Sequence, residues 1–364
     1  MQMQRELIEE ASRQVQICNA CRYCESYCSV FPAMHRERAF SDGDISQLAN
    51  LCHNCRGCYY ACQYTAPHEF DLNLPKALAE VRHDSWKAHA WPRPFAELFD
   101  RSGVAMALLL ALSFGLLFAL AQVMRPESGE GFYAYMSHSL MVAIFAPAFL
   151  LPLLTLGISL RSYWKSVGGG ALRLSDVRAA VLSAGRMRNL EGGHGDGCNF
   201  EDEDRFSHAR RHAHQAVLYG FLLCFASTSS GTVLHYGFGM EAPYGLFSLP
   251  KLLGVPGGVL LTIGCAALAW LKTRADPQLG APHAWGGEMA FILILGTVGA
   301  SGVALYAATG SGAVAWLLPL HLGLVLTFFL LTPYSKMAHG FYRLAALTVE
   351  ASRSASKSAS SKSL

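Results

Sequence analysis

Apolar and polar positions divide this chain into a mixed first part and a strongly hydrophobic second part. Residues 1–101 mix charged, polar and apolar positions, with helices predicted at 4–16 and 76–87 and a stiff connector at 91–94. After Arg101 come six stretches free of Asp, Glu, Lys and Arg, each close to the length of about 20 residues that a helix needs to cross a bilayer. The predicted spans are 102–124, 137–160, 215–236, 252–271, 289–308 and 313–334.

Composition supports a protein that is partly embedded in a lipid bilayer. Only 15% of the residues are charged and 52% are hydrophobic, whereas a soluble domain carries about 25% charged residues. The net charge of +3 is too small to indicate a nucleic-acid partner. The first 16 residues are polar and contain no apolar core of a signal peptide. We therefore expect the first part to stay in the cytosol.

The basic residues of the links predict the orientation of the spans. The link at 161–211 holds nine Lys and Arg residues, and the link after the fourth span holds Lys272 and Arg274. The opposite side has only Arg125 and Lys251. By the positive-inside rule, both termini lie in the cytoplasm, on one side of a bacterial-type inner (cytoplasmic) membrane.

Eight of the eleven cysteines form two copies of the motif C-x2-C-x2-C-x3-C, which begin 34 residues apart at Cys18 and Cys52. This spacing is typical of proteins with two [4Fe–4S] clusters, in which the fourth cysteine of each run binds the other cluster. Zinc sites more often pair two CxxC knuckles, so iron–sulfur clusters are favoured over zinc. One departure is that Pro32 and Pro67 do not directly follow the fourth cysteines. The predicted ligands are Cys18, Cys21, Cys24 and Cys62 for one cluster, and Cys52, Cys55, Cys58 and Cys28 for the other.

The predicted fold class is mainly α. Residues 33–50, between the motifs, contain many helix formers and little alternation, which favours a helical cluster domain over the compact β-rich ferredoxin. We expect a helical two-[4Fe–4S] ferredoxin-like domain at 1–101 and a six-helix transmembrane bundle at 102–345. Its cytoplasmic link at 161–211 is either a solvated loop or a surface that docks a partner or shapes a cofactor pocket. The low-complexity, Ser-rich end predicts a disordered tail at 346–364.

Four histidines in or near the third and sixth spans are predicted ligands of b-type haem. His321 lies inside a span, where a polar side chain is costly and marks a functional site by default. His321 and His339 are 18 residues apart, which is five helical turns and about 27 Å on one face. His214 and His235 are about 32 Å apart along their helix and roughly 60° off a shared face. Antiparallel spans would bring His214 level with His339, and His235 level with His321, as two bis-histidine haems require.

Alternatives to these ligands remain open. All four histidines could be unrelated polar residues. His212 could replace His214, although it lies about 140° from His235 around the helix. His138 is a spare candidate at the outer side, near a quinone. The small residues at 226–231 serve either helix packing or the close approach of a flat macrocycle. The other histidines, predicted to be surface or structural, are His35, His53, His68, His83, His89, His208 and His283.

The order of these features resembles the tricarballylate/citrate utilisation protein B family over nearly the whole chain. The local motifs that carry the resemblance are R-x2-HQ at 211–215, YGFLLCFA at 219–226, LHY at 234–236, APYG at 242–245 and PYSK-x2-HG at 333–340. The membrane part is also similar to the haem-bearing subunit of respiratory nitrate reductase, with its two histidine-paired haems. The resemblance implies a chain that reoxidises an FAD-dependent partner, which dehydrogenates tricarballylate to cis-aconitate. The electrons would pass through the clusters and haem b to membrane quinone.

The chain itself is expected to transfer electrons and to hold no catalytic site for the organic oxidation. We find no flavin or nicotinamide fingerprint and no nucleophile–base motif in the sequence. Two other functions remain open: an electron-transfer subunit of another dehydrogenase or a disulfide reductase, and a membrane redox sensor.

Overall fold

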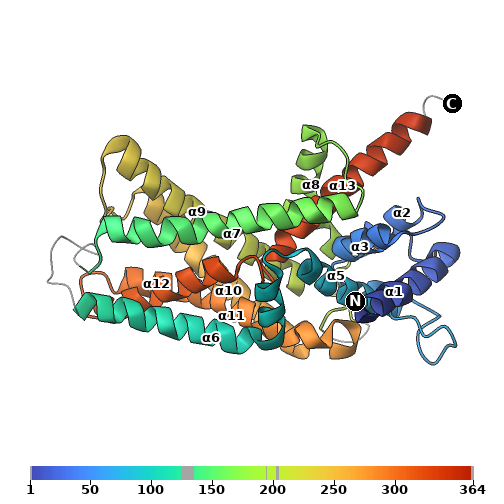
Figure 1. Cartoon of the computed structure of the whole chain (residues 1–364), viewed down its shortest axis with the longest axis horizontal. Coiled ribbons are helices and arrows are strands. Elements are labelled where there is room, and N and C mark those ends of the chain that lie inside the picture. Colours follow the sequence, from blue (N-terminus) through green and yellow to red (C-terminus); the bar gives the residue numbers. More distant parts are fainter. Residues whose placement is uncertain (1, 124–134, 194, 202–204, 362–364) are drawn as a thin grey trace.

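The computed structural model describes residues 2–123, 135–193, 195–201 and 205–361, and these residues are mainly helical, as predicted. Short helices gather at one end of an elongated molecule, and six long helices extend away from them (Figure 1). The first group comprises α1 (Gln2–Cys21), α2 (Val30–Met34), α3 (Asp42–Leu51), α4 (Gly57–Tyr60) and α5 (Leu74–His89). The long helices are α6 (Arg93–Val123), α7 (His138–Ser166), α9 (Ala209–Phe238), α10 (Leu249–Arg274), α11 (Trp285–Ala307) and α12 (Val314–Leu331). Beside the first group lie α8 (Leu174–Arg186) and α13 (Ala338–Ser361).

Helices α1, α3 and α5 pack around one hydrophobic core. Its most deeply buried members include Val15, Met34, Ile45, Leu51 and Leu78. The side chain of Ser41 accepts a hydrogen bond from the N–H of Asp44, and the Asp44 carboxylate accepts one from the N–H of Ser41. This capping box starts α3, and Asn73 caps α5 by accepting from the N–H of Lys76 at 3.2 Å. The prediction of a helical rather than β-rich domain is confirmed.

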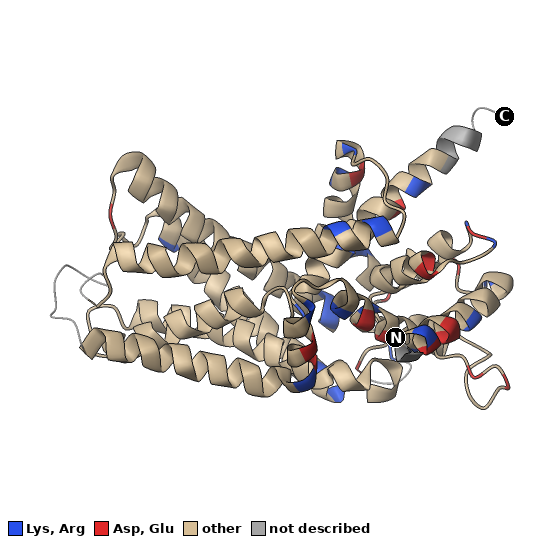
Figure 2. Ribbon diagram, viewed as in Figure 1, with Lys and Arg blue, Asp and Glu red and all other residues tan. Residues whose placement is uncertain are grey.

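All six long helices are apolar enough to cross a membrane, which matches the six predicted spans. Most are longer than the uncharged stretches that predicted them, because polar residues continue the helix beyond the apolar segment. On α6, the exposed fractions of Leu108, Leu109 and Leu112 are 60%, 66% and 72%. Apolar faces of this extent indicate a lipid environment. Lys and Arg are scarce along the six helices and gather at the end near α1–α5 (Figure 2).

Glycines allow α9 and α10 to approach closely. A Cβ atom at Gly220 would lie 2.5 Å from the backbone nitrogen of Leu261, and one at Gly257 would lie 2.8 Å from Cβ of Leu223. Small residues at such crossings are typical of packed membrane helices. The glycines early in the fourth predicted span therefore serve packing, and α10 begins at Leu249.

The long helix α6 has a kink at Ser102, whose φ of −144° and ψ of 29° are not helical. Residues 93–101 lie before the kink, and the apolar span follows it. The predicted connector at 91–94 is thus shorter than expected, because α6 begins at Arg93.

The chain end is structured beyond the predicted limit. The sequence predicts disorder over 346–364, but α13 is helical to Ser361, and Ala346, Leu347 and Val349 are buried. The prediction is corrected for 346–361, while 362–364 lie outside the described residues. The physical reason is that residues 346–349 are mainly apolar, and Ala346 and Leu347 pack into the core of α1, α3 and α5. This packing keeps them helical, although the sequence that follows them is of low complexity.

Polar contacts join α13 to the first group of helices. The Gln47 side-chain amide donates to the carbonyl of Ala346 at 2.7 Å, and the Tyr163 hydroxyl donates to Gln47 Oε1 at 3.2 Å. Arg353 of α13 donates to the Asp44 carboxylate at 3.0 Å. The last helix therefore completes the packing of the first ones.

We predict that Ala346→Asp lowers the free energy of unfolding by on the order of 3 kcal/mol, because it places an unpaired charge in the shared core. The matched control is Ala355→Asp, which makes the same change at an exposed position of α13. Thermal unfolding of the detergent-solubilised protein measures both. Equal melting temperatures for the two variants would show that α13 does not complete this core.

Candidate functional site

The first cysteine motif begins on the last turn of α1. Cys18 and Cys21 belong to this helix, and Arg22 adopts a left-handed conformation, with φ of 60°, where the helix ends. The N–H of Arg22 donates to the carbonyl of Cys18 at 3.0 Å. The chain then turns at Cys24, whose carbonyl accepts from the N–H of Tyr27 at 3.0 Å. Helix end and turn together gather the first three cysteines.

The second motif follows α3 as an irregular loop. Asn54 and Arg56 have φ values of 51° and 70°, which are uncommon for residues other than glycine and are concentrated at functional sites. Two backbone N–H groups donate to thiol sulfurs: Asn54 to Cys52 at 3.3 Å and Tyr64 to Cys62 at 3.4 Å. Such hydrogen bonds are one means by which proteins tune iron–sulfur clusters.

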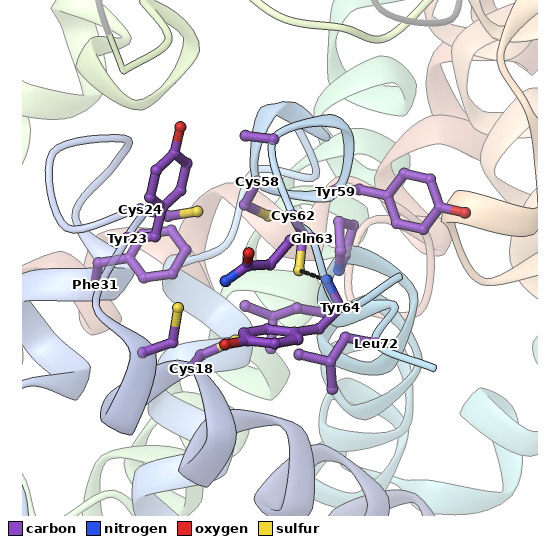
Figure 3. Close-up of a pocket in the computed structure, with 14 residues that line it drawn as sticks. Cys18, Tyr23, Cys24, Phe31, Cys58, Tyr59, Cys62, Gln63, Tyr64 and Leu72 are labelled. Carbon is purple, nitrogen blue, oxygen red and sulfur yellow. Dashed lines mark hydrogen bonds between the residues drawn. The ribbon is translucent and has the colours of Figure 1, made fainter. Parts of the chain in front are cut away.

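Cysteines of both motifs meet around one cavity. This cavity of about 210 Å³ is lined by Cys18, Cys21, Cys24 and Cys62, and also by Cys58. Figure 3 shows the sulfur atoms of Cys24 and Cys62 facing this cavity. Cys28 interacts electrostatically with Cys52 and Cys55, and Cys58 interacts with these three and with Cys24. The contacts are compatible with the two predicted sets of four, whose assignment stays a prediction.

The thiol environment fits metal binding. Burial, together with the neighbouring thiols, raises the pKa of Cys18 and of Cys24 to about 12. A metal ion replaces the proton of a coordinating thiol, which relieves this cost. Within the described residues, no three His, Cys, Asp or Glu side chains converge on one point to hold a single ion. Five of the thiols line one cavity instead, an arrangement that is compatible with a multi-iron cluster.

Part of the link between α7 and α9 covers the second motif. The N–H of Asn199 donates to the carbonyl of Cys55 at 3.0 Å. The guanidinium groups of Arg56 and Arg210 lie 4.7 Å and 4.1 Å from the ring centroid of Phe200. This part of the link forms a wall of the cysteine site, so shaping a cofactor pocket fits it better than a solvated loop does.

The inner histidine pair is in direct contact. The ring centroids of His214, on α9, and His339, on α13, are 5.8 Å apart with an interplanar angle of 74°. A metal–nitrogen bond of about 2 Å on each side would place two axial imidazoles at about this separation. Nδ1 of His339 hydrogen-bonds the carbonyl of Lys336, which leaves Nε2 as the free ring nitrogen. Burial holds the pKa of His339 well below its usual range. The neutral ring is the form that binds metal.

His212, the alternative to His214, is exposed, so it fits the ligand role less well.

The outer histidines make other contacts, and their assignment as haem ligands stays a prediction. His235 stacks on His138, with centroids 4.2 Å apart and an angle of 24°. His321 instead hydrogen-bonds through Nδ1 to the hydroxyl of Ser301 at 2.9 Å. Among the described residues, His235 and His321 have no ring contact. The reason is that α9 packs along α10 while α12 packs along α6 and α11, and that His235 is offset around α9 from the face of His214.

His53 directly follows Cys52 and interacts electrostatically with His214, and its burial fits the structural role that the sequence predicts. Its Nδ1 hydrogen-bonds the carbonyl of Leu51 at 3.0 Å. Burial lowers its pKa well below the usual range, and the charges of Arg343 and Arg210 lower it further. His53 is therefore a neutral ring beside the second motif. His83 and His89 are structural as expected, since they hydrogen-bond Asp100 and Ser162 at 2.7 Å and 2.9 Å.

A buried amide holds the second motif in place. The Asn54 side chain donates to the carbonyls of Pro75 at 3.1 Å and Leu279 at 2.7 Å. Its oxygen accepts from Nε of Arg56 at 3.1 Å. The loop is thereby tied to α5 and to the segment between α10 and α11.

Comparisons with known proteins agree on one family. A family model described as Citrate utilization protein B matches residues 103–360, and one described as the Citrate utilization protein B Fer4-like domain matches residues 11–88. A protein of Escherichia coli named Citrate utilization protein B is 41% identical over 343 residues, which cover 93% of this chain and 90% of that protein. No solved structure matches the chain.

We predict that Asn54→Ala lowers the free energy of unfolding by about 1–3 kcal/mol, because two buried carbonyls lose their donor. It also removes a residue type that tolerates positive φ. The control is Gln63→Ala, which deletes an exposed amide next to Cys62. Denaturant unfolding monitored by circular dichroism measures both variants. The role assigned to Asn54 is rejected if its variant is as stable as the control.

Proposed function

This chain belongs to the citrate utilization protein B family, and from that premise we propose that it carries electrons from a flavoprotein dehydrogenase to membrane quinone. Its Fer4-like domain indicates an electron-transfer role, and six apolar helices are compatible with a multi-pass membrane protein. In the proposal, two [4Fe–4S] clusters and b-type haem connect the partner to the quinone. The partner is FAD-dependent and, by family resemblance, oxidises tricarballylate.

The observation that carries the proposal is that thiols of both cysteine motifs line one cavity. We assign Cys18, Cys21, Cys24 and Cys62 to the first set, and Cys28, Cys52, Cys55 and Cys58 to the second set, and the contacts of Cys28 and Cys58 support this assignment. Bound clusters would supply one-electron couples at these positions. Zinc has no redox chemistry and would supply none.

Exposure suggests the direction of electron flow. Cys21 is exposed, and the adjacent loop residue Tyr23 has 70% of its surface exposed. The second set lies beneath the link and beside α13, the helix that carries His339. We propose that electrons enter at the first set from the docked flavoprotein and leave from the second set toward the inner histidines.

His214 and His339 are the proposed axial ligands of an inner b-type haem, because their rings meet in a T-shaped arrangement with the centroids 5.8 Å apart. Haem would supply a one-electron iron couple between the second set and the bilayer. His235 and His321 remain the proposed ligands of an outer haem, and the stacking on His235 makes His138 an alternative to His321. The quinone is proposed to bind within the membrane part.

The proposed domain boundaries and orientation have structural support. The kink at Ser102 coincides with the boundary between a cytoplasmic domain at 1–101 and a membrane domain at 102–345. Basic residues gather at the end that holds α1–α5 and α13 (Figure 2). By the positive-inside rule, that end faces the cytoplasm of a bacterial-type cell, and both termini lie there.

Serine substitutions test the crossed assignment of the thiols. We expect Cys62→Ser to change the same electron paramagnetic resonance signal as Cys18→Ser, because both belong to the first set. Cys28→Ser should change the signal affected by Cys55→Ser. The control is Cys265→Ser, a thiol outside both motifs, which should leave both signals intact. If Cys62→Ser instead affects the signal of Cys55→Ser, each motif holds its own cluster and the crossed assignment is wrong.

Cofactor content and quinone reduction test the function. Protein purified anaerobically in detergent should contain about ten iron, eight acid-labile sulfide and two b-type haems per chain, as two clusters and two haems require. After stoichiometric reduction with dithionite, mixing with a soluble ubiquinone analogue should reoxidise both cofactor types. His339→Ala should lose one haem, keep both clusters and slow the reoxidation.

The control for the haem variant is His212→Ala, which removes an exposed ring two residues from His214. It should keep both haems. Clusters that become reduced but pass no electrons to quinone would contradict the proposal and favour a redox sensor. Protein with clusters and no haem would refute the haem ligands while leaving the thiol assignment.

A further inference from the structure

Two arginines from the membrane part reach the loop of the second cysteine motif. Arg210, at the start of α9, donates through Nη1 to the carbonyl of Asn54 at 2.7 Å. Arg343, on α13, donates through Nη2 to the carbonyl of Cys52 at 2.7 Å and through Nε to the carbonyl of Asn50 at 3.3 Å. The acceptors lie on the last turn of α3 and on the loop that follows it, so both helices hold the same segment.

Each arginine stands one helical turn from one of the paired histidines. Arg210 precedes His214 by four residues on α9, and Arg343 follows His339 by four residues on α13. Residues four apart lie on the same face of a helix. Helices α9 and α13 thus share one arrangement. Each carries a histidine that contacts the histidine of the other helix and an arginine that contacts the cysteine loop.

Among the residues that the structure describes, neither Arg210 nor Arg343 has an Asp or Glu oxygen within ion-pair distance. A guanidinium group is charged at neutral pH. Arg343 interacts electrostatically with Cys52, and Arg210 interacts with Cys55. The positive charges therefore face the thiols of the second set.

We propose that Arg210 and Arg343 are positioning residues for electron transfer between the second set and the inner histidines, an inference that rests on the proposed function. Their hydrogen bonds fix the loop at one distance from His214 and His339. Their charges stabilise the more negative, reduced state of a metal group held by the second set. One electron is lost by that group and gained by the group at the histidines, and no bond or proton is exchanged.

The test compares Arg343→Gln and Arg210→Gln with Arg353→Gln in the complete, anaerobically purified protein. Arg353 is a matched control because it also lies on α13 and also joins it to other elements, through the Asp44 carboxylate and the carbonyl of Val167. Redox titration followed by electron paramagnetic resonance gives the midpoint potential of each cluster. Stopped-flow absorbance gives the rate at which haem becomes reduced after dithionite is added.

We expect Arg343→Gln and Arg210→Gln to lower the midpoint potential of the second-set signal and leave the first-set signal unchanged. Haem reduction should become slower, because the loop is no longer held at one distance from His214 and His339. Arg343→Lys separates the two effects. It keeps the charge and hence the potential, but it cannot make both bonds of the guanidinium, so haem reduction remains slow.

Three results would overturn the inference. The potential of the second-set signal could be unchanged in both glutamine variants, or it could shift equally in Arg353→Gln, which would make the effect merely structural. If the glutamine variants do not assemble, a wild-type rate of haem reduction in Arg343→Lys overturns the positioning role. Wild-type protein without any clusters or haem would instead refute the proposed function, which is a separate outcome.

Discussion

The buried carbonyl groups of the second cysteine motif need hydrogen-bond donors, and this need determines how the two parts of the molecule meet. A loop that turns its thiols toward a metal group cannot satisfy its own carbonyls by forming a helix. The carbonyl of Cys52 accepts from both Arg82 of α5 and Arg343 of α13, each at 2.7 Å. The carbonyl of Asn54 accepts from Arg210 of α9. The bonds that satisfy the loop are therefore the bonds that join it to the bundle.

The two parts of the molecule are stabilised by different forces. Helices α1, α3 and α5 bury apolar side chains from water, so their core is an ordinary hydrophobic one. In lipid that driving force between helices is absent, and α9 and α10 rely on the close contact that Gly220 and Gly257 permit. At the boundary, neither force suffices, because charged groups and irregular backbone meet there. Specific hydrogen bonds from Asn54, Gln47 and the arginines fill that role.

The sequence is informative where spacing alone determines the chemistry. The cysteine motifs predict two groups of four thiols, an assignment that stays a prediction, and uncharged length predicts the six spans. The pairing of His214 with His339 is predicted from one continuous sixth helix, but α12 ends at Leu331 and His339 lies on α13. A helical repeat shared with His321 therefore does not explain their contact. Helical repeat does not predict which residue contacts His235. It gives the position of a residue along the helix axis, but it does not say which neighbouring helix that residue contacts. Likewise Asn199 and Phe200 belong to no motif, and only the folded link brings them to the second set. In the sequence, Arg210 and Arg343 are indistinguishable from other basic residues that follow the positive-inside rule. Only the structure shows their hydrogen bonds to the carbonyls of Asn54 and Cys52.

The packing of α13 against the first helices has a consequence for biosynthesis. Ala346 and Leu347 belong to the core of α1, α3 and α5, although some 260 residues and all six apolar helices separate them from the end of α5. Translation begins at the N-terminus, so the ribosome makes α1–α5 first and α13 last. The core of α1, α3 and α5 therefore stays incomplete until all six apolar helices have been made, because α13 follows them in the chain. The packing around the cysteine motifs is thus finished only after the apolar helices have left the ribosome.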